Sequence, residues 1–150
     1  MVDTAEQARA IVDAVRYALP SDFDKRLVVA MIETVDAIDN LDEMLKVDGI
    51  DVFFIGPGDL SQNMGYPPAP PFGEPRPEAV MEKVAVAVDK IRAAGKITGT
   101  LATADELPHW WAFHHSFSIP VIQCLDTKHT AWGSSPTRTE AAEFLRHRPF

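Results

Sequence analysis

The chain has too few cysteines for an internal disulfide, too little positive charge for a typical nucleic-acid-binding domain and no apolar run long enough to span a membrane. Cys124 is the only cysteine among 150 residues, so no disulfide can form within the chain. The formal net charge is −8, whereas nucleic-acid-binding domains usually carry a basic face. No apolar run approaches the ~20 residues of a membrane-spanning helix, and residues 1–4 do not resemble a signal peptide. We therefore expect a cytoplasmic protein that binds neither nucleic acid nor a membrane.

The composition is otherwise that of a globular protein. Apolar residues make up 46% of the chain and charged residues 24%, and the length is sufficient for one domain with its own core. Many of the prolines lie between residues 67 and 77. Because proline fixes φ and lacks an N–H group, we expect an extended loop there. The sequence shows no second domain, so residues 1–150 are interpreted as a single domain.

Helical and strand-like patterns alternate along the chain. Apolar residues at helical spacing predict helices over 5–19, 35–45, 77–94, 104–113 and 139–146. Short apolar runs predict strands over 27–32, 52–55, 97–101 and 121–125, the first of them buried on both faces. Residues Thr4 to Gln7 form a possible capping box, and Thr34 can cap the second helix. The alternation predicts an α/β fold with a parallel sheet, either half of an eight-stranded barrel or a small open sheet.

Two acidic side chains follow two successive predicted strands. Glu33 comes directly after the strand over 27–32, and Asp59 comes after the strand over 52–55 and the turn Gly56-Pro57-Gly58. Because parallel strands end at the same edge of a sheet, both acids should project from one edge. Carboxylate oxygens are ligands for divalent cations, so the pair suggests a cation that holds a small anionic substrate. The alternative is that both acids merely begin helices, where the helix dipole favours them.

Several segments together resemble the HpcH/HpaI aldolase family, which is related to citrate lyase β subunits. The similarity runs from residue 1 to about residue 104 and is carried by Met31-Ile32-Glu33-Thr34, by the run from Val47 to Ser61, and by Ala94-Gly95-Lys96. The resemblance implies a partial (β/α)8 TIM barrel, roughly the C-terminal half with about four parallel strands. It also implies a homo-oligomer.

The resemblance further implies a function and a set of site residues. Glu33 and Asp59 match acids that bind a divalent cation, Mg²⁺ or Mn²⁺. Gly56, Pro57, Gly58 and Asp59 match the segment that binds the carboxylate of pyruvate. The implied reaction is the cleavage of a 4-hydroxy-2-oxoacid into pyruvate and an aldehyde through a metal-bound enolate.

The same sequence is compatible with further interpretations. The family's histidine base and its arginine belong to earlier strands that have no counterpart here, so no catalytic residue is identified. Met31 also stands where the family usually has glutamine. One alternative is therefore a truncated, non-catalytic remnant that binds a metal and an oxoacid or serves in assembly. The chain could also form an unrelated flavodoxin-like sheet, or correspond to a partial reading frame.

Overall fold

The centre of the molecule is a parallel sheet of three strands. The computed structural model describes residues 1–69 and 74–100, in which β1 (Val29–Ile32) pairs with β2 (Val52–Ile55), and β2 pairs with β3 (Ile97–Thr100). Ile32 is level with Ile55, and Ile55 is level with Thr100, so the three strands end at one edge. The predicted parallel α/β arrangement is confirmed for these residues. The elements predicted over 104–113, 121–125 and 139–146 lie outside them.

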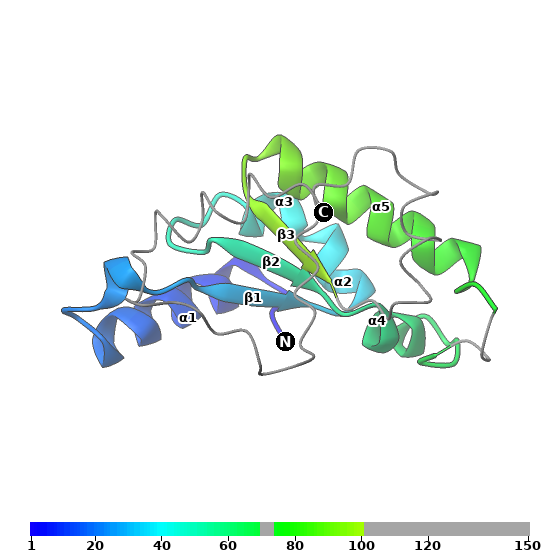
Figure 1. Cartoon of the computed structure of the whole chain (residues 1–150), viewed down its shortest axis with the longest axis horizontal. Helices are drawn as coiled ribbons and strands as arrows, with labels where there is room; N and C mark the ends of the chain where they lie inside the picture. The colour runs from blue at the N-terminus through cyan, green and yellow to red at the C-terminus, as the bar shows by residue number, and fades with distance from the viewer. Residues whose placement is uncertain (70–73, 101–150) are drawn as a thin grey trace, which may run out of the picture.

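Helices cover one face of this sheet, and one short helix lies at its carboxyl edge (Figure 1). The covering helices are α1 (Ala5–Ala18), α2 (Val35–Asp39), α3 (Leu41–Met44) and α5 (Glu78–Ala93), and a 3-10 turn, η1, spans Phe23–Lys25. The helix at the edge is α4 (Pro57–Asn63). No helix within residues 1–69 and 74–100 is long and apolar enough to cross a membrane.

The main core lies between the helices and the sheet. Alternate strand residues Ala30, Ile32, Phe53 and Ile55 are at most 1% exposed and belong to one apolar cluster with helix residues such as Leu41, Met44 and Ile91. The prediction that the first strand is buried on both faces is wrong, because Val29, on the face away from the helices, is 42% exposed. β1 lies at the edge of the described sheet and has a neighbouring strand, β2, on one side only. β2 lies in the middle and is buried along its whole length.

Side-chain capping explains where α1 and α2 begin. The Thr4 hydroxyl accepts a hydrogen bond from the Gln7 N–H (3.2 Å), which confirms the Thr4 half of the predicted capping box. The Gln7 side chain accepts instead from the Asp3 N–H (2.7 Å), one residue before the position that a capping box requires. Thr34 caps α2 as predicted, because its hydroxyl accepts from the Ala37 N–H (3.0 Å). α5 begins one residue later than predicted, with Pro77 as its N-cap.

The helix predicted over 35–45 is instead divided into α2 and α3. The division falls at Asn40, whose backbone has φ −88° and ψ 2°. The Asn40 side-chain amide donates a hydrogen bond to the Asp3 carbonyl (3.0 Å), which holds the junction against the segment that precedes α1. A contact between segments so distant in sequence leaves no trace in helical periodicity.

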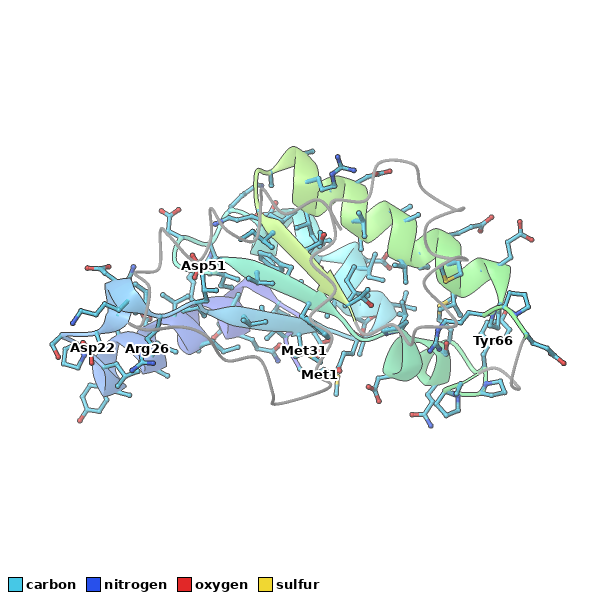
Figure 2. The ribbon with its side chains drawn as sticks, in the orientation of Figure 1. Met1, Asp22, Arg26, Met31, Asp51 and Tyr66 are labelled. Carbon is cyan, nitrogen blue, oxygen red and sulfur yellow. The ribbon has the colours of Figure 1, made fainter. Side chains whose placement is uncertain are left out.

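The two ends of the sheet have different polar contacts. Figure 2 shows Asp51 at the amino end of the strands and Tyr66 beyond their carboxyl end. The Asp51 carboxylate accepts a hydrogen bond from the Val28 N–H (2.8 Å), so it holds the approach to β1 beside the start of β2. The carboxyl end carries the two acids that the sequence singled out.

Candidate metal centre

The segment predicted as a turn after β2 is the first turn of a helix. Gly56 is the N-cap of α4 and Pro57 is its first residue, a position where the missing proline N–H has no intrahelical acceptor to lose. The helix continues because Leu60 and Ser61 are buried, and the Ser61 hydroxyl donates to the Pro57 carbonyl (2.8 Å). Asp59 therefore lies in the first turn of α4, where the helix dipole favours a carboxylate.

The structure brings Glu33 and Asp59 together at the carboxyl edge. Glu33 follows β1 directly, and the Gly56 N–H donates to the Ile32 carbonyl (3.0 Å), so the start of α4 lies beside the end of β1. Burial raises the pKa of Glu33 above its usual value, and the charge of Asp59 raises it further. The amino group of Met1 opposes these effects, while a hydrogen bond with Asp59 and the charge of Asp3 add to them. The Asp59 carboxylate is thus close enough to Glu33 to affect its ionisation.

Gly56 gives the Glu33 side chain the space that it occupies. A Cβ atom on Gly56 would lie 2.7 Å from Glu33 Oε1 and 2.8 Å from Glu33 Cγ, distances that real Cβ atoms do not show. The Glu33 side chain therefore lies across the bare backbone of Gly56 on its way to Asp59. The sequence pattern predicts only substrate binding for Gly56, and the structure adds this steric role.

The backbone after Glu33 is held from two sides. The Thr34 hydroxyl donates to the Asp3 carboxylate (2.6 Å), and the Val35 N–H donates to the side-chain oxygen of Asn63 (2.9 Å). Sequence reasoning missed Asp3 and Asn63 because their partners are 31 and 28 residues away. Each residue type is a common helix-capping residue, which is the only local signal that either one gives.

Glu33 and Asp59 fit a divalent cation that keeps some ligand positions open. Within residues 1–69 and 74–100, no cluster of three or more His, Cys, Asp or Glu side chains is placed to hold a metal ion. The protein would therefore offer two carboxylates. Mg²⁺ is commonly bound by one or two carboxylates together with water and substrate oxygens. A cation between the acids would also relieve the repulsion that raises the Glu33 pKa.

The first turn of α4 also offers backbone donors beside the acids. The N–H groups of Gly58 and Asp59 have no acceptor within the helix because they belong to its first turn. Gly58 is half-buried, and a Cβ atom there would lie 3.3 Å from the Pro68 carbonyl oxygen. The loop after α4 therefore approaches this turn closely and narrows the space around it.

Parallel α/β sheets commonly bind small ligands beyond the carboxyl ends of their strands. In this chain that edge carries the two acids and the first N–H groups of α4. The chain belongs to the HpcH/HpaI aldolase/citrate lyase family, whose model matches residues 1–108. This confirms the resemblance seen in the sequence.

Known relatives support this assignment. The chain is 38% identical to a 2-keto-3-deoxy-L-rhamnonate aldolase of Escherichia coli strain K12, over 71% of this chain and 47% of that protein. It is similar in structure to an HpcH/HpaI aldolase from Desulfitobacterium hafniense DCB-2 (TM-score 0.61, 24% identity, 75% of this chain and 50% of that one). It is also similar to the citrate synthase SbnG (TM-score 0.59, 24% identity, 75% and 50%). The chain thus spans about half the length of the relatives that it matches.

Proposed function

We propose that this chain carries the cation- and oxoacid-binding part of a metal-dependent carbon–carbon lyase. The reaction is the cleavage of a 4-hydroxy-2-oxoacid into pyruvate and an aldehyde. The observation that supports this most directly is the contact between Glu33 and Asp59 at the carboxyl edge of the sheet. Membership of the family and the similarity to an aldolase support the type of reaction. The fold would be part of a (β/α)8 barrel, with residues 1–150 as one domain.

Each residue of the site has a role in this proposal. Glu33 and Asp59 hold Mg²⁺ or Mn²⁺, and Gly56 leaves room for the Glu33 side chain. The N–H groups of Gly58 and Asp59 bind the carboxylate of the oxoacid, and Pro57 begins the helix turn that presents them. When bound, the cation supplies positive charge beside the oxygen that becomes negative as the carbon–carbon bond breaks.

The proposal requires groups that the described residues do not provide. No proton-transferring base is assigned within residues 1–69 and 74–100, so the base must come from elsewhere in the assembled protein. We propose that the protein is a homo-oligomer, in which another subunit can supply this base. We also propose that it operates in the cytoplasm. Open strand edges are prone to association. Among the described residues no full strand pairs with the outer edge of β1, where the Val2 N–H donates one hydrogen bond to the Met31 carbonyl (3.2 Å).

A second candidate function is binding without catalysis. This alternative, a truncated remnant that binds a metal and an oxoacid or serves in assembly, is not favoured, because the curated relatives that the chain matches are aldolases. Exchange of the pyruvate methyl protons with deuterated solvent separates the two candidates. A lyase exchanges these protons in the presence of Mn²⁺, whereas a binding module does not.

The metal site itself is tested by titrating the purified protein with Mn²⁺ and then with pyruvate, followed by electron paramagnetic resonance. We expect one Mn²⁺ site per chain whose spectrum changes when pyruvate is added, and oxaloacetate decarboxylation that depends on Mn²⁺. Asp59→Ala should remove all of these signals. Asp89→Ala, which changes an exposed acid on α5, should retain them. Equal Mn²⁺ binding by Asp59→Ala and the unaltered protein would overturn the proposal.

A further inference from the structure

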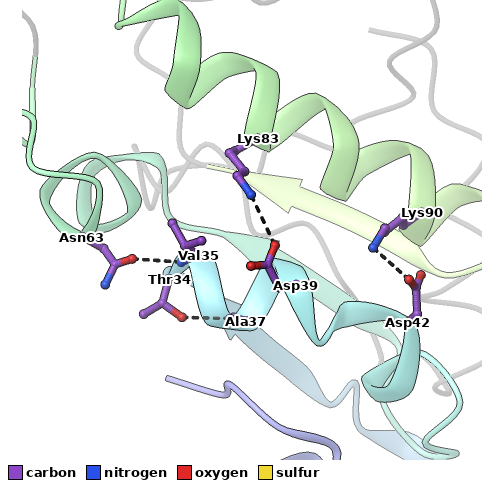
Figure 3. Close-up of polar contacts among 8 residues, drawn as sticks. All are labelled: Thr34, Val35, Ala37, Asp39, Asp42, Asn63, Lys83 and Lys90. Carbon is purple, nitrogen blue, oxygen red and sulfur yellow. Dashed lines mark hydrogen bonds and ion pairs between the residues drawn. The ribbon is translucent and has the colours of Figure 1, made fainter.

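Asn63 connects the helix that carries Asp59 to the backbone that follows Glu33. Its side-chain oxygen accepts a hydrogen bond from the Val35 N–H at 2.9 Å, as Figure 3 shows. Asn63 is the last residue of α4, and Val35 is the first residue of α2. The bond therefore joins the end of one helix to the start of another, at the edge where the two acids meet.

The Val35 N–H needs an acceptor from outside its own helix. The first N–H groups of a helix have no intrahelical partner, and Thr34 supplies its hydroxyl to Ala37 rather than to Val35. Asn63 fills this position from a distance of 28 residues along the chain. A residue of α4 thus caps α2 at Val35, in addition to the cap that Thr34 provides at Ala37.

The position of Asn63 on α4 links it to Asp59. The two residues are four apart on one helix, so they lie on the same face of α4. Val35 lies two residues after Glu33. The start of α4 is fixed by the hydrogen bond from the Gly56 N–H to the Ile32 carbonyl (3.0 Å), and the Asn63 bond fixes its other end against the same segment.

We infer that Asn63 is a positioning residue that sets the spacing between the Glu33 and Asp59 carboxylates. Two hydrogen bonds hold the elements that carry the acids against each other, one from the Gly56 N–H to the Ile32 carbonyl and one from the Val35 N–H to Asn63. The bond to Val35 does this without contacting the acids. The expected effect on cation binding rests on the proposed function. The spacing between the Glu33 and Asp59 carboxylates, however, can be tested without any metal.

The experiment compares Asn63→Ala with Asn63→Asp, which retains an oxygen acceptor of the same reach. Gln62, the exposed neighbour of Asn63 on α4, provides the matched controls. Gln62→Ala reports the change in helix propensity, and Gln62→Asp reports the effect of an added charge. All variants are made in the full chain.

The first measurement is made by NMR without metal. In Asn63→Ala we expect the Val35 amide to exchange about two- to tenfold faster, as for the loss of one hydrogen bond. We also expect the carboxyl carbon resonances of Glu33 and Asp59 to shift at fixed pH. Gln62→Ala should leave both observables unchanged, and Asn63→Asp should retain slow exchange at Val35. Unchanged exchange and unchanged resonances in Asn63→Ala would overturn the inference.

The second measurement is the Mn²⁺ dissociation constant. Asn63→Ala should weaken Mn²⁺ binding by roughly tenfold, at the lower end of what is lost when a residue that orients metal ligands is removed. Asn63→Asp should bind Mn²⁺ as Gln62→Asp does. Equal weakening in Asn63→Ala and Gln62→Ala would contradict a positioning role. If the unaltered protein binds no Mn²⁺, the proposed function fails, and the metal-free measurement alone decides whether Asn63 sets the spacing.

Discussion

The residues of β1 and β2 that face the helices are apolar and buried, whereas the side chains that meet beyond the ends of these strands are acidic. Ile32 and Ile55 are at most 1% exposed in an apolar core. One residue after Ile32, the Glu33 carboxyl lies beside Asp59, with its pKa raised by burial and by that neighbouring charge. Apolar burial stabilises the fold, whereas two crowded carboxylates destabilise it. The core thus stabilises the fold, whereas the edge carries a local cost in stability, as is typical of functional sites.

The largest effect should come from the core. Phe53→Ala removes the largest fully buried side chain among residues 1–69 and 74–100, and we expect the free energy of unfolding to fall by about 3–5 kcal/mol. Urea unfolding followed by circular dichroism measures the change. Val86→Ala on α5 is the control, because Val86 is 48% exposed and its truncation should cost less than about 0.5 kcal/mol. Similar losses in the two variants would remove the distinction between core and surface.

The next effect should come from filling the edge with a cation. Mn²⁺ at about one hundred times its dissociation constant should raise the free energy of unfolding of the unaltered protein by about 2.7 kcal/mol. A chelator should reverse the change. Asp59→Ala should show no such rise, although its core is intact. An equal rise in Asp59→Ala would mean that Mn²⁺ stabilises the protein from another site.

The sequence was sufficient to predict the sheet and the meeting of the two acids. The strand over 52–55 is a short apolar run between Asp51 and Gly56, and its predicted bounds are those of β2. The edge shared by Glu33 and Asp59 follows from parallel pairing, which the alternation of elements predicted. These features depend on local patterns and on one topological rule.

The same reasoning missed α4 and the contacts that support the acids. Glycine and proline around residues 56–58 are compatible with both a turn and the start of a helix. The structure shows a helix, in which Leu60 and Ser61 are buried. The contacts of Asp3 with Thr34 and of Asn63 with Val35 join segments that are distant in sequence. No periodicity or local motif encodes such pairs.

The steric role of Gly56 allows the edge to be perturbed without changing a charge. In Gly56→Ala the new methyl group would meet Glu33 Oε1 at 2.7 Å, so the carboxylate must move away from its present position. We expect Mn²⁺ affinity to fall about tenfold, or about 1.4 kcal/mol. Gly58→Ala is the control, because its methyl group would meet only the Pro68 carbonyl oxygen, at 3.3 Å. If Gly58→Ala weakened Mn²⁺ binding as much as Gly56→Ala, the displacement of Glu33 would not be the cause.

The smallest effect should show that the edge opposes stability when no cation is bound. Because the folded state raises the Glu33 pKa above its ordinary value of 4.5, folding is disfavoured once the group ionises. This penalty is absent below pH 4.5, grows as the pH rises, and is complete above the folded-state pKa. Glu33→Gln should therefore stabilise the metal-free protein at pH 7 by less than about 1 kcal/mol, the range for partly exposed charges.

Denaturant unfolding at pH 4 and pH 7 measures this gain, which should appear only at the higher pH. Glu82→Gln, an exposed acid on α5, should give no gain at either pH. Glu33→Gln should lose Mn²⁺ binding at the same time, because a neutral amide is a weaker ligand than a carboxylate. A variant that is less stable than the unaltered protein at pH 7 without metal would show that the Glu33 carboxylate supports the fold, and the contrast between core and edge would fail.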